Sequence, residues 1–101
     1  MKSKILLIGI DGINLNTALE VSPVLAKTKA EGFFTTMTID PPTWSGPSWS
    51  TILTGTRIDS HAVIDNSFIG HKLLHNPDLL SRAYYQDQST CLLYTSPSPR
   101  D

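Results

Sequence analysis

Apolar residues in the first forty positions fall into two short runs with a helical pattern between them. Residues 4–10 form a continuous β-rich run that is apolar from Ile5 to Ile10 and is closed by an Asp-Gly pair, which is typical of a buried central strand in a parallel sheet. Ser22 followed by Pro23 predicts the start of a helix over about 22–31, because serine caps helices and proline suits the first helical position. Residues 33–39 are β-branched and aromatic with partial alternation, and they predict a second strand.

This order of strand, helix and strand predicts an α/β fold with right-handed crossovers between parallel strands. Two further helices are expected downstream. Pro47 opens one that ends at Gly55, and residues 76–78 begin another. The expected buried face of the last helix consists of Leu79, Leu80 and Ala83.

Composition and charge exclude several classes of function. The chain has 101 residues with 8 Lys and Arg against 9 Asp and Glu, a net charge of -1 and 40% hydrophobic residues. Without a cluster of Lys and Arg it has no footprint for binding nucleic acid, and no run reaches the roughly 18 apolar residues of a membrane-spanning helix. The apolar run at 5–10 is too short for the core of a secretory signal peptide, so the expected location is the cytoplasm.

Residues 91–101 read as the in-frame translation of a transposon adapter used to prepare sequencing libraries. We therefore expect residues 1–90 to be an amino-terminal fragment of a catalytic domain, followed by a non-native tail at 91–101. Setting the tail aside removes Cys91, the only cysteine, and with it any disulfide or cysteine zinc site.

Two polar residues stand where an α/β sheet places its chemistry. Asp11 follows the first predicted strand, and ligands bind beyond the carboxyl ends of parallel strands. Its carboxylate could hold a divalent cation or a hydroxyl, or could simply form the turn before Gly12. Ser45 precedes the helix expected from Pro47, where unpaired N–H groups and the positive end of the helix dipole favour an anionic group. That position suits a serine that attacks a phosphate or sulfate ester, although spacing alone also allows a plain helix cap.

Asp11, Ser45, the Thr54-Gly55 pair and the stretch from Ser60 to Asn66 together resemble the alkaline phosphatase superfamily. The closest likeness is to its type I phosphodiesterase/nucleotide pyrophosphatase branch, whose pattern includes a Ser-His-Gly-Ile-x-Asp-Asn motif. The resemblance covers nearly all of residues 4–85. It implies the alkaline-phosphatase-like three-layer α/β fold with a largely parallel sheet, of which this chain holds the amino-terminal portion.

The resemblance also implies roles for individual residues. Asp11 would be a metal ligand, and Ser45 would be both the nucleophile and a metal ligand. Ser48 takes the place of an Asn that holds a phosphate oxygen in the nucleotide pyrophosphatases, and its hydroxyl could donate the same hydrogen bond to substrate. The motif residues expected to pack beside the site are His61, Asp65 and Asn66.

The implied activity is hydrolysis of a small phosphoester through a covalent phospho-serine, with two divalent metal ions, zinc being the expected metal. The family's other Asp and His ligands would lie beyond Thr90, so the fragment itself is expected to be inactive. Sulfatase activity is not expected, because Trp49 replaces the Arg of the sulfatase signature. The preference for monoesters or diesters and the oligomeric state stay open.

Two other functions are compatible with the sequence. Residues 46–50 nearly match the G-x-S-x-G elbow of acyl-ester hydrolases, with Ser48 as nucleophile, although the second glycine is absent. A related fold without its metals could instead act as a non-catalytic binding module.

Two pairs of side chains have further candidate roles. His71 and His75 stand four residues apart and could bind zinc from one helix face, but an exposed loop is the simpler expectation. Trp44 and Trp49 flank Ser45 and could stack on an aromatic leaving group, or at least one of them could pack in the core.

Overall fold

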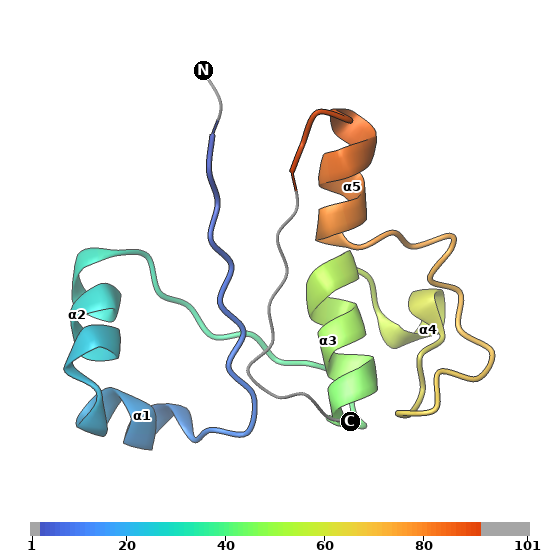
Figure 1. The fold of residues 1–101 in the computed structure, drawn as a ribbon. Helices are drawn as coiled ribbons and strands as arrows, with labels where there is room; N and C mark the ends of the chain where they lie inside the picture. Colours follow the sequence, from blue (N-terminus) through green and yellow to red (C-terminus); the bar gives the residue numbers. More distant parts are fainter. Residues whose placement is uncertain (1–2, 92–101) are drawn as a thin grey trace. The chain divides into compact units, whose positions relative to one another are not determined.

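The computed structural model describes residues 3–91, which fall into two compact units, 3–38 and 39–91 (Figure 1). The first unit contains α1 (Leu15–Val21) and α2 (Pro23–Glu31). The second contains α3 (Ser45–Thr54), α4 (Ile58–His61) and α5 (Leu79–Gln86). Residues 3–91 form no strand.

The predicted α/β fold with a three-layer arrangement and a parallel sheet is therefore wrong for this structure. Residues 4–10 lack regular secondary structure and are exposed rather than buried, with Ile5 at 90%. Residues 33–39 also form no strand, and Phe33 is 93% exposed. A β-rich run becomes a strand only when a neighbouring strand takes up its backbone hydrogen bonds. Neither run has such a neighbour within the described part of the chain, so β-propensity alone overestimated both elements.

The helices of the first unit begin at side-chain caps. Asn14 Oδ1 accepts a hydrogen bond from the N–H of Thr17 at 3.1 Å, and Ser22 Oγ accepts one from the N–H of Leu25 at 3.2 Å. Each bond satisfies a backbone donor that a helix start leaves unpaired. The helix predicted over about 22–31 is thus confirmed with its serine cap. Helix α1 was not expected, although its Asn cap is visible in the sequence.

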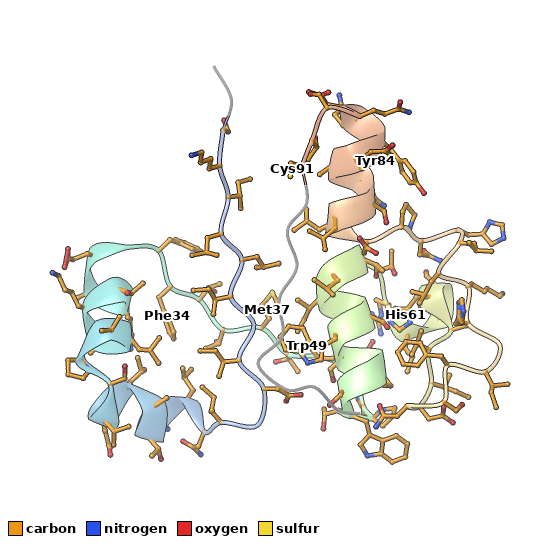
Figure 2. All side chains as sticks on the ribbon, viewed as in Figure 1. Phe34, Met37, Trp49, His61, Tyr84 and Cys91 are labelled. Atoms are coloured by element: carbon orange, nitrogen blue, oxygen red, sulfur yellow. The ribbon has the colours of Figure 1, made fainter. Side chains whose placement is uncertain are left out.

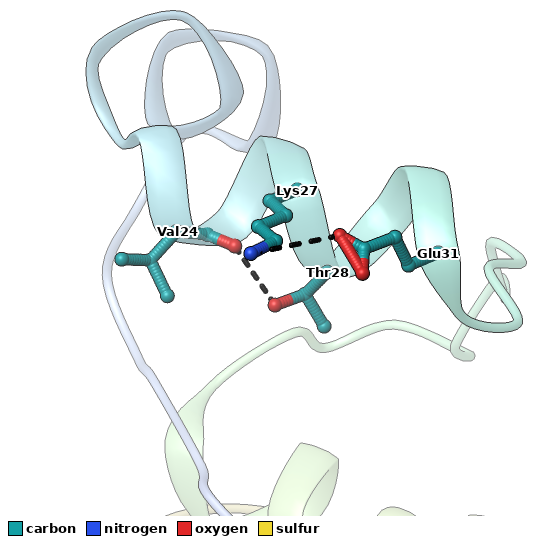
Figure 3. Close-up of polar contacts among 4 residues, drawn as sticks. All are labelled: Val24, Lys27, Thr28 and Glu31. Carbon is teal, nitrogen blue, oxygen red and sulfur yellow. Dashed lines mark hydrogen bonds and ion pairs between the residues drawn. The ribbon is translucent and has the colours of Figure 1, made fainter.

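Side chains on α2 interact with their own helix (Figure 3). Thr28 Oγ1 donates to the carbonyl oxygen of Val24 at 2.8 Å, and Lys27 Nζ lies 3.9 Å from Glu31 Oε2. An exposed ion pair four residues apart on a helix contributes only about 0.3–0.5 kcal/mol. These contacts stabilise α2 locally and bury none of its residues.

In the second unit, α3 and α4 lie side by side (Figure 1). His61 at the end of α4 and Val63 just after it are fully buried, and Ser50 and Thr54 of α3 are nearly so. Among residues 3–91, the fully buried apolar side chains are those of Val63 and Pro47. The interior of this unit therefore consists largely of small and polar residues, whose burial requires hydrogen-bond partners.

The helix predicted from Pro47 is confirmed, but it begins two positions earlier, at Ser45. Gly55 ends it with φ of 70°, in the left-handed region that glycine adopts without steric cost. Just beyond, Arg57 Nη2 pairs with Asp40 Oδ2 at 3.1 Å, which joins the two ends of the α3 segment.

Helix α5 begins after Asp78, whose Oδ1 accepts from the N–H of Ser81 at 2.8 Å, so the predicted helix start is confirmed. Its predicted buried face is wrong. Leu79 is 50% and Leu80 is 40% exposed, and α5 contains no buried residue. An apolar helix face needs a packing partner, and the described residues cover this one only in part.

None of the helices described for residues 3–91 is long and apolar enough to cross a membrane. The expected adapter-derived tail lies outside the described residues except for Cys91, which is exposed.

Candidate active site

Ser45 is the first residue of α3 and is exposed. Trp44 precedes it in extended conformation, with φ of -77° and ψ of 161°, and its side chain makes no capping hydrogen bond. The first turn of α3 carries no acidic residue, so no side-chain charge there offsets the positive end of the helix dipole. The hydroxyl of Ser45 is therefore placed where an anionic group is electrostatically favoured.

The backbone donors at this helix start are already committed. The N–H of Gly46 donates to Asn66 Oδ1 at 2.7 Å, Pro47 has no N–H, and the N–H of Ser48 donates to the carbonyl oxygen of Trp44 at 3.0 Å. The sequence interpretation relied on unpaired N–H groups at this point. Asn66 takes one of them and Pro47 removes another, so an incoming anion meets fewer backbone donors than expected.

Ser48 lies three residues after Ser45 on α3 and is half-buried. Positions i and i+3 are neighbours on a helix surface, so the two serines share one side of α3. Its predicted role in binding substrate, and its alternative role as an acyl-ester nucleophile, both stay predictions.

From α4, the side chain of His61 reaches α3 (Figure 2). Its Nδ1 accepts from the N–H of Val63 at 3.0 Å, and its Nε2 lies 2.9 Å from Thr51 Oγ1. Because a backbone N–H can only donate, Nδ1 is unprotonated, and the neutral ring carries its proton on Nε2 and donates it to Thr51. Burial lowers the pKa of His61, and the charge of Asp59 opposes that shift in part. Neutral His61 therefore links α4 to α3 through its hydrogen bond with Thr51.

Asp65 makes a local turn rather than a contact with Ser45. Its Oδ1 accepts from the N–H of Ser67 at 2.8 Å and from Ser67 Oγ at 2.5 Å. These hydrogen bonds to the charged form lower the pKa of the Asp65 carboxyl, chiefly through the Ser67 hydroxyl. A carboxylate that caps its own turn in this way shapes the chain that carries Asn66.

Ala62 stands where the family motif has glycine. It ends α4 with φ of 54° and ψ of 28°, in the left-handed region that favours glycine. This chain adopts that left-handed conformation with alanine.

Asp11 belongs to the first unit, where it is exposed and precedes Gly12 with φ of 70°. Ser45 belongs to the second unit, so the two candidate metal ligands, Asp11 and Ser45, lie in different units. Among residues 3–91, no three His, Cys, Asp or Glu side chains gather closely enough to hold a metal ion. The described residues therefore do not complete a site for the expected metal pair.

His71 and His75 are both exposed, as expected for a loop. His71 Nδ1 accepts from the N–H of Leu73 at 3.2 Å, which gives this ring a local role. They form no part of a metal cluster within the described residues.

A pocket of about 330 Å³ lies in the second unit, lined by α3, the loop that follows Phe68, and α5. It reaches Gly46, the residue after Ser45, and its aromatic lining comes from Trp49, Phe68 and Tyr85. Trp49 is half-buried on α3 (Figure 2), whereas Trp44 is 56% exposed. Trp49 is thus partly packed against the second unit, whereas Trp44 is exposed to solvent.

Sequence reasoning missed two partners of the motif. The N–H of Gly46 donates to Asn66 Oδ1 across 20 residues, and Thr51 Oγ1 forms a hydrogen bond with His61 Nε2 across 10 residues. The glycine after Ser45 was a signal of close approach, but nothing in the spacing identifies which side chain approaches it.

The model of the type I phosphodiesterase/nucleotide pyrophosphatase family matches residues 5–90. This match spans Ser45 and the whole motif that ends at Asn66. The chain belongs to the type I phosphodiesterase/nucleotide pyrophosphatase family, which confirms the resemblance to the alkaline phosphatase superfamily. No curated protein and no solved structure gives a match.

Proposed function

We propose that the protein hydrolyses phosphate esters of the phosphodiester or nucleotide pyrophosphate type, with Ser45 as the nucleophile. Family membership over residues 5–90 indicates phosphodiesterase or pyrophosphatase chemistry. The observation that carries the choice of residue is the position of Ser45, exposed at the first position of α3 with no acid in the first turn.

In the proposed reaction, Ser45 Oγ gives up its proton and forms a bond to phosphorus while the bond from phosphorus to the leaving ester oxygen breaks. The leaving group takes up a proton, and water then cleaves the phospho-serine and regenerates the hydroxyl. The positive end of α3 stabilises negative charge on the phosphoryl oxygens. His61 is not the base, because both of its ring nitrogens are engaged by Val63 and Thr51.

The proposal includes two divalent metal ions, with zinc as the expected metal and Asp11 and Ser45 as oxygen donors. A bound divalent ion would lower the pKa of a hydroxyl and stabilise charge on ester oxygens. Residues 3–91 supply no cluster of ligands, so we assign the other ligands to sequence outside them. The proposal therefore places the activity in a gene product that extends past residue 90, and we expect this chain alone to be inactive.

The test is an assay of that longer gene product on an aryl phosphodiester, with metal added and with a chelator. We expect turnover that the chelator abolishes, and a loss of roughly 10³-fold or more in Ser45→Ala, as found when nucleophilic serines are removed. Ser48→Ala is the matched variant on the same helix, and we expect it to keep measurable turnover. The 101-residue chain with added zinc is expected to show none.

The same variants separate the rival functions. Metal-independent cleavage of an acyl ester that Ser48→Ala abolishes and Ser45→Ala preserves would replace the proposal with an acyl-ester hydrolase. Absence of turnover on either ester by the longer product would favour a binding module.

A further inference from the structure

The pocket of about 330 Å³ in the second unit lies along a face of α3 that begins at Gly46, and Ser45 does not line it. On α3 its lining falls at positions 46, 49, 50, 53 and 54, which is the spacing of one helix face. Its volume lies in the range of cavities that hold small ligands, about 300–1,000 Å³. The pocket is therefore not the place where Ser45 would attack phosphorus, and it has room for a ligand of its own.

Three aromatic rings line this pocket, and they come from three parts of the chain. Trp49 is half-buried on α3 (Figure 2), Phe68 belongs to the loop after α4, and Tyr85 belongs to α5. The face of an aromatic ring is the negative part of its quadrupole, so it attracts a cation that contacts it. A pocket with three such rings favours a cationic ligand.

The backbone of Phe68 is strained where its ring lines the pocket. Its φ is 62°, in the left-handed region, which costs a residue other than glycine about 1–2 kcal/mol. For a bulky side chain this conformation is an outlier. Strained residues of this kind cluster at sites that bind ligands. The geometry of Phe68 is thus a second observation that points to a ligand at this pocket.

Asp78 carries the one charge among the described residues that line the pocket. Its Oδ1 accepts from the N–H of Ser81 at 2.8 Å, whereas its Oδ2 accepts no hydrogen bond within residues 3–91. The nearby Arg82 is exposed and lies outside the lining, where its Nε donates to the carbonyl oxygen of Pro77 at 3.1 Å. A half-buried carboxylate attracts a cation and repels an anion, so the charge of the pocket complements the rings.

The rest of the lining decides which kind of cation fits. Leu53, Leu73 and Leu74 give the pocket apolar surface, which cannot replace the water around a small hydrated ammonium ion. The amide of Asn76 offers it no donor, because Nδ2 already donates to the carbonyl oxygens of Ser60 and Lys72. An ammonium group covered by alkyl groups loses little hydration and places apolar surface against the leucines.

We propose that this pocket binds an organic cation whose ammonium group is fully alkylated, with the positive nitrogen against the aromatic rings and beside the carboxylate of Asp78. The inference goes beyond the proposed function, because it requires neither the hydroxyl of Ser45 nor a metal ion.

The test titrates tetramethylammonium chloride into the 15N-labelled 101-residue chain at constant ionic strength. NMR follows the indole N–H of Trp49 and the backbone amides of Ser50 and Ser81, which all line the pocket. Neopentyl alcohol is the neutral probe of similar shape. We expect saturable shifts with tetramethylammonium and binding of neopentyl alcohol that is weaker by roughly 5-fold, the attraction of two unit charges about 4 Å apart in water.

Asp78→Asn removes the charge and keeps an acceptor for the N–H of Ser81, because Asn and Asp cap helices equally well. We expect it to weaken tetramethylammonium binding by roughly 5-fold. Asp87→Asn is the matched control. Asp87 Oδ1 also accepts from a backbone N–H, that of Ser89, and the substitution removes the same charge outside the pocket.

Phe68→Leu tests the rings without changing any charge. Leucine keeps the position apolar but has no aromatic face, so we expect binding to weaken by about 2–5-fold. Tyr84→Leu, on α5 and outside the lining, should bind tetramethylammonium as the original chain does. The inference is overturned by an absence of saturable shifts, by neopentyl alcohol binding as tightly as tetramethylammonium, or by equal losses in Asp78→Asn and Asp87→Asn. Full binding in Phe68→Leu overturns the role of the rings.

Discussion

Within each of the two units, the side-chain hydrogen bonds span very different distances along the sequence. In 3–38, the side-chain hydrogen bonds described above join residues three or four apart, and the apolar runs beside the helices stay exposed. In 39–91, side chains bond across 10, 16 and 20 residues, and His61 and Val63 are fully buried.

The difference shows which kind of interaction organises each unit. Burying a polar group requires partners with defined geometry, and in the second unit two of these partners, Asn66 for Gly46 and His61 for Thr51, come from distant parts of the chain. The hydrophobic effect is non-directional, so the exposed apolar side chains of residues 5–10 and 33–39 specify no particular contact among the described residues. The predictions below test this contrast, from the largest expected effect to the smallest, by amide hydrogen exchange resolved for each unit.

The largest effect is expected from His61→Ala. It removes a buried ring and leaves the N–H of Val63 and the hydroxyl of Thr51 without their partner, which should cost about 2–4 kcal/mol of unfolding free energy in the second unit. Exchange in the first unit should not change. The exposed His71 is the control, and His71→Ala should cost less than about 1 kcal/mol. Equal effects of the two substitutions would contradict the contrast.

Gly46→Ala comes next. Its Cβ would meet the backbone of Asp65 at 2.8 Å, so the contact with Asn66 must open, at a cost of about 1–3 kcal/mol. Ser48→Ala, on the same helix, should stay within about 0.5 kcal/mol. If the backbone N–H of residue 46 stays protected from exchange in Gly46→Ala, its protection does not come from the hydrogen bond to Asn66.

A pH series tests His61 without mutation. Its pKa is lowered by burial, so as the pH falls through the ordinary value of about 6.5 the unfolded chain binds a proton that the folded chain does not yet bind. The contribution of neutral His61 is therefore complete above that value and is lost as the pH falls toward the folded pKa. Unfolding free energy in the second unit should drop over this window, and His61→Gln should remove the dependence. Asp65, whose pKa is also lowered, acts at lower pH, below about 4.

Ala62→Gly should stabilise the second unit slightly. Relief of the left-handed conformation gains about 1–2 kcal/mol, and the greater freedom of glycine in the unfolded chain offsets about 0.5–1 of it. We expect a net gain of about 0.5 kcal/mol. Ala83→Gly, inside α5, should instead destabilise its helix by about 1 kcal/mol, and the same sign for both would contradict the strained geometry of Ala62.

The smallest effect is expected in the first unit. Ile5 is 90% exposed, so Ile5→Ser should change the unfolding free energy of this chain by less than about 0.5 kcal/mol. Denaturation and exchange would measure it together with Val63→Ala, which deletes methyl groups from a fully buried side chain. A loss from Ile5→Ser as large as that from Val63→Ala would show that the apolar run is buried in solution.

Sequence reasoning succeeded where the determinants are local. Ser22 and Asp78 cap their helices through neighbours three residues away, and Gly55 ends α3 through its own φ. It failed for the two predicted strands, because a strand depends on a distant partner that the run itself does not specify.

In the candidate site, too, the features set by neighbouring residues could be predicted and those set by long-range contacts could not. The position of Ser45 on a helix start follows from the residues that surround it in sequence, and the family match supports the motif as a whole. The meeting of Asn66 with Gly46, and of His61 with Thr51, depends on how the intervening loops return to α3. Polar contacts across 20 and 10 residues leave no periodic signal in a single sequence.

The central claim is that Ser45 attacks phosphorus, and trapping the covalent intermediate tests it most directly. The longer gene product would be mixed with an aryl phosphodiester, quenched in acid during turnover, digested with trypsin and mapped by mass spectrometry. The account predicts a phosphoryl adduct on Ser45 within the peptide from Ala30 to Arg57, absent from Ser45→Ala. Full turnover with no adduct at Ser45, and undiminished turnover in Ser45→Ala, would contradict it.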